Sequence, residues 1–377
     1  MQHRLQSRPN WQIALLMTAA LRVFYTALAA AAAVFVHPQA NLIRSNALTA
    51  ELPTPGGWHY AWLGIWERFD TLWYLRIAAH GYDLPAAVVF YPLYPWLIRQ
   101  LSWMVEPIFA ALFISTLAAF FYFCGLLRLA QSDLPDRCSF NAVLLAAIWP
   151  ASFFLFAGYT EALAAALIVW ALACARDEQW LTATACAVAA GLTRSVGTLL
   201  IIPLLIMAWR AGGIQSKKKA RFSVLLAPLG TVAYWLWLRQ TGRRSIAAAY
   251  RIYWHTEVAA PWKTLWQAIR SLFLHFDFLV LVSLVALTVF LMAGVMARRR
   301  TEDRSFSAAI LVHLLLRLCW PPLFGTPRYL LPVYPVFLTM AQWMEKNSRT
   351  RFIFLCTVLF AFNLVWMWAF LRWSLVL

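Results

Sequence analysis

The sequence predicts an all-α protein that crosses a membrane many times. Of its 377 residues, 63% are hydrophobic and only 12% are charged, whereas a soluble domain carries about a quarter charged residues. The 21 Trp residues are a second indication, since Trp gathers at the boundary between lipid and water. A third is a series of long apolar runs, because a helix needs roughly 20 apolar residues to cross a bilayer. We therefore expect one transmembrane domain over residues 1–377.

Ten apolar runs meet or approach the spanning length. They are 11–36, 107–130, 140–157, 158–175, 180–209, 222–238, 276–297, 306–323, 329–344 and 352–373. The first run is too long for the apolar part of a secretory signal, so we expect it to be a retained helix.

The run 180–209 is long for one helix and short for two, and Arg194 lies at its middle between two glycines. We expect two short helices with a break near 193–195, which makes a bundle of about eleven transmembrane helices. The alternative is one long helix, with 86–104 as a spanning segment instead. That segment contains Pro92, Pro95 and Arg99, which suit an interfacial helix better.

The net charge of +17 has two compatible explanations. One is the excess of Lys and Arg on the cytoplasmic side, with contacts to anionic membrane lipids. The other is an anionic substrate such as a phosphate. Nucleic acid is not an expected partner, because so little of the chain is soluble. Placing the basic clusters at the N-terminus and in 210–221, 298–304 and 346–351 inside leaves loops of about 37–106 and 239–275 outside.

Metal and disulfide chemistry have little basis in the sequence. The six Cys residues show no zinc-site spacing and no disulfide framework. No paired His and no Asp-x-Asp occur at the expected outer face. We expect no cofactor, and a divalent cation stays open.

The first outer loop contains the strongest chemical signal. Residues 66–83 read WERFDTLWYLRIAAHGYD, and 71–80 are expected to form a short surface helix. Asp70 stands where an N-cap would and Gly81 where the residue after the helix would. Asp70 is therefore either a cap of the first turn or a catalytic carboxylate. The aromatic and proline residues of 90–99 suit a piece resting at the membrane interface.

The run 69–82, followed by 90–99, resembles the first luminal loop of the PIG-V family. These are GPI mannosyltransferase 2-like enzymes of the GT-C glycosyltransferase class. Phe69 stands where the family has Trp. Three further segments are similar to family motifs in the same order, namely GYTEAL at 158–163, GLTRSVG at 191–197 with Ser195 in place of Pro, and RYLLP at 328–332.

The resemblance implies a GT-C-like bundle in which Asp70 is the catalytic base. The donor would be a polyprenyl- or dolichyl-phosphate-mannose, and the acceptor a glycolipid or glycan on the extracytoplasmic face. An inverting transfer needs a base on one side of the sugar and positive charge at the departing phosphate. The compact chain is typical of a bacterial inner-membrane protein, or of the ER membrane if the source is eukaryotic.

The candidates for substrate binding each have a plainer alternative. Arg194 interrupts an apolar run, where a charge is costly and often functional, yet it could simply pair with Glu161. Arg328 could be a solvated turn charge, and Glu161 a favourable charge at a helix N-terminus. The full set expected to bind substrate is Arg194, Arg328, Glu161, Arg76, His80 and Tyr329.

Two other functions fit a basic polytopic protein. A transporter or flippase for a lipid-linked sugar would also need intramembrane Arg residues, but predicts internal repeats, which the sequence does not show. A non-catalytic envelope-assembly protein predicts that Asp70→Asn leaves function intact. In the second outer loop, basic and aromatic residues interleave, which suits an acceptor or lipid head groups.

Overall fold

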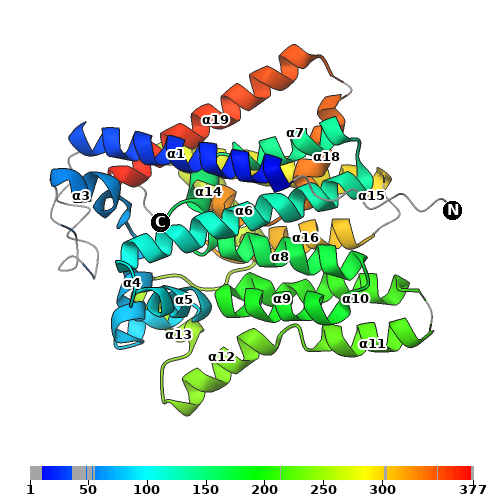
Figure 1. Cartoon of the computed structure of the whole chain (residues 1–377), viewed down its shortest axis with the longest axis horizontal. Coiled ribbons are helices and arrows are strands. Elements are labelled where there is room, and N and C mark those ends of the chain that lie inside the picture. Colours follow the sequence, from blue (N-terminus) through cyan, green and yellow to red (C-terminus); the bar gives the residue numbers. More distant parts are fainter. Residues whose placement is uncertain are drawn as a thin grey trace.

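The computed structural model describes residues 11–35, 48, 53, 56–212, 214–300, 304–345 and 347–374. In this part of the chain the regular elements are helices, with no strand among them. Most of the helices run along one long axis (Figure 1). The expected all-α class is confirmed.

Five helical segments among the described residues are long and apolar enough to cross a membrane. They are Trp11–Phe35 (α1), Pro107–Asp133 (α6), Ala220–Gln240, Phe278–Arg298 and Arg349–Leu371 (α19). The third joins the end of α11 (Ile214–Leu225) to α12 (Leu229–Gln240), and the fourth lies in α15 (Phe278–Arg300). The chain is therefore a membrane protein of helical type, and the count of eleven spans stays a prediction.

Shorter helices make up the rest of the bundle. The first group is α3 (Gly57–Trp62), η2 (Gly64–Trp66), α4 (Asp70–His80), η3 (Pro85–Val89), α5 (Leu93–Leu101), α7 (Asp136–Ala147), η4 (Ser152–Leu155) and α8 (Glu161–Arg176). The second is α9 (Trp180–Thr193), η5 (Ser195–Leu200), α10 (Ile201–Arg210), α13 (Ile246–Tyr253), α14 (Pro261–His275), α16 (Arg304–Leu318), α17 (Thr326–Tyr329) and α18 (Tyr334–Glu345).

Two of the predicted apolar runs are not continuous helices. In 140–157, α7 ends at Ala147 and the chain is irregular up to Thr160 apart from η4, because Pro150 has no N–H to continue a helix. In 329–344, Pro332 and Pro335 separate α17 from the body of α18 in the same way. Irregular backbone is tolerated at membrane depth where protein covers it, and every residue from 148 to 160 is buried.

The break expected near 193–195 is confirmed. Helix α9 ends at Thr193, Arg194 is extended, and η5 turns back onto α9 before α10 begins. A Cβ on Gly197 would lie 2.3 Å from the carbonyl carbon of Ala190, so this close return requires glycine. The alternative of one long helix is wrong, and 86–104 holds only η3 and the nine-residue α5, which is too short to span.

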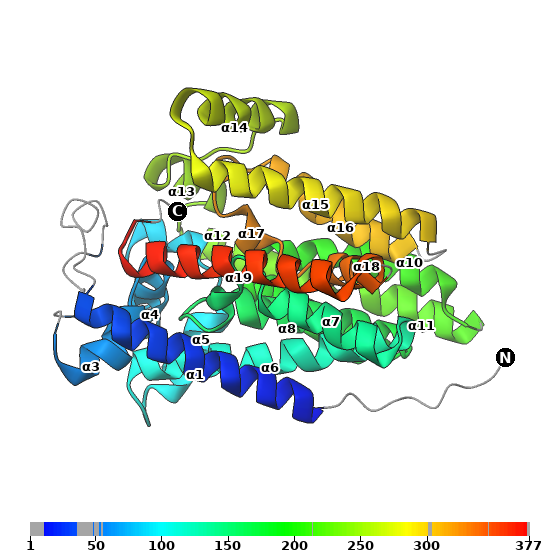
Figure 2. The same ribbon diagram turned by 90° about the horizontal axis from the view of Figure 1, so that it is seen from above.

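The basic clusters that the sequence places on the cytoplasmic side can be located relative to α4. The ends of α10, α15, α16 and α18 that adjoin the basic clusters lie at one end of the molecule, together with the start of α1 (Figures 1 and 2). Helices α3, α4, α5 and α13 lie at the opposite end. The helix ends next to three of the basic clusters thus lie opposite α4, as the positive-inside prediction requires, and the N-terminal cluster lies outside the described residues.

Candidate active site

Four charged side chains from four separate segments meet at the end of the bundle that contains α4. Arg328 Nη1 lies 3.1 Å from Asp70 Oδ2, and Arg328 Nε lies 3.0 Å from Glu161 Oε1. Glu161 Oε1 also accepts a hydrogen bond of 2.6 Å from Arg194 Nη1. The order Asp70–Arg328–Glu161–Arg194 forms a continuous chain of alternating charge, which we call the charge chain.

The charge chain is closed in the middle and more open at its ends. The side chains of Glu161 and Arg328 are 2% and 5% exposed, whereas those of Asp70 and Arg194 are 18% and 19% exposed. A ligand would therefore meet Asp70 and Arg194 first. Glu161 Oε2 is buried and has no hydrogen-bond partner among the described residues, so the charge chain retains an unused acceptor.

Asp70 does not cap α4, and that alternative is wrong. The helix begins at Asp70 itself, Phe69 occupies the cap position, and no side chain caps the first turn. Phe69 has a positive φ of 48°, which is rare for a large residue, and its ring packs on Phe370 and Trp373 of the α19 end. This turn leaves the Asp70 carboxylate free to pair with Arg328. Gly81 ends α4 with a φ of 71°, as expected.

The segment before α8 approaches α4 closely. The Asp70 N–H donates to the Tyr159 hydroxyl at 3.2 Å. A Cβ on Gly158 would lie 2.7 Å from Thr71 Cγ2, so the absence of a side chain at 158 allows this contact. The approach places the first turns of α4 and α8, with their two carboxylates, beside each other.

The α8–α9 hairpin suits the charges that it holds. Glu161 lies in the first turn of α8 and Arg194 directly follows the last turn of α9. A carboxylate at a helix N-terminus and a cation at a C-terminus both interact favourably with the helix dipoles. Arg194 Nη1 also donates to Thr160 Oγ1 at 3.0 Å, and Thr160 is hydrogen bonded to Tyr74 at 3.2 Å.

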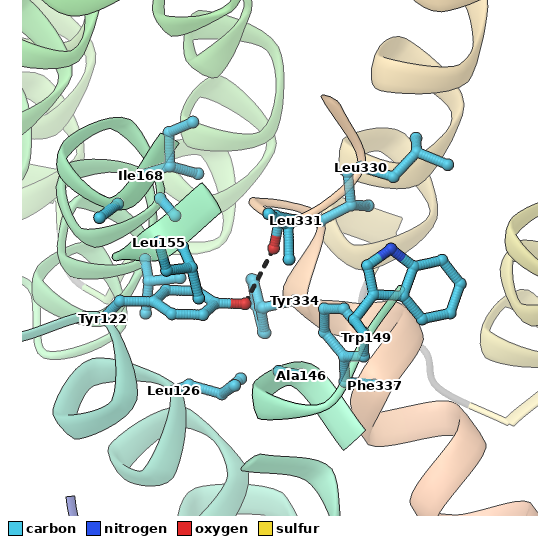
Figure 3. Close-up of a cluster of buried hydrophobic side chains, with 14 of the residues drawn as sticks. Tyr122, Leu126, Ala146, Trp149, Leu155, Ile168, Leu330, Leu331, Tyr334 and Phe337 are labelled. Carbon is cyan, nitrogen blue, oxygen red and sulfur yellow. Dashed lines mark hydrogen bonds between the residues drawn. The ribbon is translucent and has the colours of Figure 1, made fainter. Parts of the chain in front are cut away.

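Arg328 is held in place by the packing around α17. Tyr122 donates to the Leu331 carbonyl at 2.8 Å (Figure 3). Trp149 Nε1 donates to the Pro327 carbonyl at 3.0 Å. These bonds fix the backbone on both sides of Arg328 to α6 and to the end of α7.

Aromatic rings surround the Arg328 guanidinium. Its carbon lies 4.9–5.3 Å from the ring centres of Tyr329, Phe154 and Tyr159. Tyr329 accepts a hydrogen bond of 2.9 Å from Arg328 Nη2, lies 5.0 Å below the Arg194 guanidinium, and is 38% exposed. The faces of aromatic rings attract cations, so these rings help to hold the Arg328 guanidinium beside the two carboxylates.

Burial changes the acidity of the candidate base. Desolvation raises the pKa of the Asp70 carboxyl above its usual range, and Arg328 opposes part of that rise. A carboxylate with a raised pKa is a better proton acceptor.

Two of the six residues expected to bind substrate lie outside the charge chain. Arg76 forms a two-pronged ion pair with Asp83 at 2.5 and 3.1 Å, and His80 is exposed at the end of α4. Both point away from the chain because they lie on the later turns of a helix whose first turn supplies Asp70. Their expected role in binding is not supported by their position.

Several neighbours were missed by the sequence interpretation. Arg317 and Phe154 lie in apolar runs that gave no separate signal. Tyr159 and Thr160 stand directly before Glu161 in the GYTEAL motif, so that motif could have indicated them. Tyr74 lies one turn after Asp70 on α4 and could have been found by helical spacing.

Two apolar grooves reach helices that hold or adjoin members of the charge chain. A groove of about 470 Å³ runs between α5 and α6 and reaches Leu163, two residues after Glu161. A second of about 280 Å³ is bordered by Leu192, two residues before Arg194, and by Tyr234 and Trp237 of α12. Both grooves are lined mainly by apolar side chains, which suit a hydrocarbon chain better than a polar ligand.

Among the described residues, no group of three or more His, Cys, Asp or Glu side chains comes together to hold a metal ion.

Comparison of the chain with protein-family models and with curated proteins found no match. The similarity to the PIG-V family therefore stays a prediction that rests on the motifs themselves.

Proposed function

We propose that this protein transfers a hexosyl residue, in the first instance mannosyl, from a polyprenyl- or dolichyl-phosphate-sugar to a glycolipid or glycan acceptor. The transfer would take place at the extracytoplasmic face with inversion at the sugar. The observation that supports it is the charge chain, in which a partly exposed carboxylate lies 3.1 Å from a buried guanidinium. The motifs of the PIG-V resemblance contain all four of its members.

Asp70 is the base in this proposal. The acceptor oxygen forms a bond to the anomeric carbon as the bond from that carbon to the phosphate oxygen breaks. The acceptor proton passes to the Asp70 carboxylate, and the lipid phosphate leaves with both bonding electrons. Inverting glycosidases use a carboxylate in the same way on a water molecule, and the raised pKa of Asp70 suits proton acceptance.

Arg328 and Arg194 stabilise the departing phosphate. Guanidinium groups bind phosphate oxygens through two parallel N–H donors, and charge already in place costs no reorganisation during the reaction. Glu161 holds both guanidiniums at 2.6 and 3.0 Å, so their orientation is set before a ligand arrives. Tyr329, partly exposed beside them, adds a hydroxyl at the same surface.

The lipid part of the donor has a place to lie. The groove between α5 and α6 starts beside the first turn of α8 and is lined mainly by apolar side chains, including Phe113, Leu117 and Phe121. In this proposal the isoprenoid chain lies in that groove, which reaches α8 at Leu163. This arrangement favours a carrier lipid over a water-soluble sugar donor.

The test is a transfer assay on the full-length purified chain in proteoliposomes. The donor is radiolabelled polyprenyl-phosphate-mannose, and the acceptor is a total glycolipid extract. We expect Asp70→Asn to lower product formation by about 1,000-fold or more, because general-base catalysis contributes about 10²–10⁴-fold. Asp83→Asn, the same change at an exposed carboxylate paired with Arg76, is the matched control and should keep full activity.

Two outcomes would reject the proposal. If donor crosses the membrane but no product forms, and Asp70→Asn has no effect, a transporter fits better. If the chain neither moves nor consumes the donor, an assembly role fits better.

A further inference from the structure

One more arginine lies beside the charge chain without belonging to it. Arg317 is in the last turn of α16 and is 6% exposed. Its guanidinium lies 5.0 Å from the Tyr329 ring centre. Within the described residues it forms no ion pair with a carboxylate; its partners are oxygen atoms of the chain that follows it.

The Arg317 guanidinium organises the connection between α16 and α17. Nε donates to Thr326 Oγ1 at 3.1 Å and Nη2 to the Phe324 carbonyl at 3.2 Å. The other bonds run from Nη1 to the Trp320 carbonyl and from Nη2 to the Pro322 carbonyl. Carbonyls at alternate positions of an irregular segment thus all point at one side chain.

This segment needs such a donor. Its backbone forms turns and bends instead of helix from 319 to 325, so its carbonyls need hydrogen-bond partners outside a helix ladder. Prolines at 321 and 322 cannot supply N–H groups. A planar guanidinium with five donors can bind several carbonyls at once, whereas an ammonium has three donors and no fixed plane.

The bonds that Arg317 makes to this segment affect the position of Arg328. Gly325 turns the chain with a φ of 83° and starts α17, the four-residue helix that carries Arg328 and Tyr329. A helix of four residues is too short to hold its own position, so its neighbours must fix it. Its beginning is held by Arg317 through Thr326, and its end by Tyr122 and Trp149 as described above.

Two other arginines, Arg68 (buried) and Arg22 (partly buried), contact the backbone in the same manner. Arg68 donates to the carbonyls of Gly64, Glu67 and Leu371, directly before Asp70. Arg22 of α1 donates to the Phe156 carbonyl at 2.6 Å, within the irregular segment before Glu161. Arginines bound to carbonyls thus adjoin the site segments, while Arg194 and Arg328 are bound to carboxylates.

We propose that Arg317 is a positioning residue for the site: it fixes the 320–326 segment and so places Arg328 and Tyr329 against the two carboxylates. This role needs no contact between Arg317 and the substrate, because Arg317 acts through the segment that it binds. The kinetic part of the inference rests on the proposed function, and the structural part does not.

The structural part is tested by amide hydrogen exchange on the full-length protein in detergent. Arg317→Lys keeps the charge but not the flat set of donors. We expect exchange over 323–331 to become at least about tenfold faster, with α6 and α8 unchanged. Arg128→Lys is the matched control, since Arg128 pairs with Asp177 at the other end of α8. Unchanged exchange in 323–331 would overturn the inference, and this experiment needs no substrate.

The kinetic part is tested by a double-mutant cycle. Arg317→Lys should lower kcat by about 10- to 100-fold, since a displacement of about 1 Å in a site costs about that much. In an Arg328→Lys background the same change should cost less than about threefold, because the group that Arg317 positions has already been altered. Losses that multiply in full would show that Arg317 acts independently, through folding or direct contact, and would overturn the positioning role. If the unaltered chain transfers no sugar, the proposed function fails and the exchange result alone decides the structural part.

Discussion

Replacing Glu161 by Gln tests whether the charge chain stabilises the fold. Glu161 is 2% exposed and pairs with two guanidiniums, at 2.6 Å from Arg194 and 3.0 Å from Arg328. Gln keeps the size of the side chain but removes its charge. Removing one partner of a buried ion pair costs about 3–5 kcal/mol, because the remaining charge is left uncompensated. Asp70 still pairs with Arg328, so we expect about 3 kcal/mol, the lower end of that range.

The measurement is thermal unfolding of the purified protein, followed by Trp fluorescence. At about 2 °C per kcal/mol, a value suited to large domains, the midpoint should fall by about 6 °C. Glu106→Gln is the matched control, because Glu106 pairs with His59 at the surface and is 45% exposed. Its midpoint should stay unchanged. If Glu161→Gln unfolds no earlier than Glu106→Gln, the two guanidiniums are not dependent on Glu161 and the reasoning is wrong.

Three further predictions follow from the site geometry. Burial raises the pKa of Asp70, and Arg328 opposes part of that rise, so kcat/KM should fall as the pH drops through a pKa above the ordinary aspartate value of about 3.9. Arg328→Gln should move this fall in kcat/KM to higher pH. A pH profile without such a fall would contradict Asp70 as the base. Gly158→Ala places a methyl group 2.7 Å from Thr71 Cγ2, so it should lower the free energy of unfolding by about 1–3 kcal/mol and kcat by at least tenfold. In the control Gly212→Ala the new Cβ meets only Glu178 Oε1, at 3.4 Å, so both unfolding and turnover should stay unchanged. His80→Ala should leave kcat and the donor KM within about twofold, since His80 is exposed at the end of α4; a tenfold loss would restore it to the binding set.

Much of the site could be predicted because its members break a local pattern. Arg194 interrupts an apolar run between two glycines, and the structure confirms the break there. Asp70 and Glu161 stand at predicted helix starts, and both are in the first turns of their helices. These signals are local, so one sequence is enough to read them.

The misjudged features depend on contacts that are distant in sequence. The capping reading of Asp70 was wrong because Arg328, 258 residues later, takes its carboxylate. Arg76 and His80 were expected to supply positive charge for a phosphate, and the structure places Arg76 against Asp83 and His80 at the exposed end of α4. Arg317 gave no signal of its own, since its partners are carbonyl groups of an irregular segment that apolar composition does not show.

Helix lengths were also overestimated where prolines interrupt an apolar run. The segments 140–157 and 329–344 have the hydropathy of spanning helices. Their irregular parts are covered by neighbouring helices, which satisfies the constraint that lipid imposes on free backbone groups. Composition reports that a segment is shielded from water but not whether lipid or protein shields it.

The opposition between the basic end of the bundle and the end with α4 has a consequence for supply. If the basic clusters face the cytosol, as the positive-inside rule predicts, the charge chain lies at the extracytoplasmic end of the bundle. A charged nucleotide cannot cross a hydrocarbon layer about 30 Å thick unaided. Under the proposed function, the sugar donor would therefore reach the site attached to a carrier lipid in the outer leaflet of the membrane.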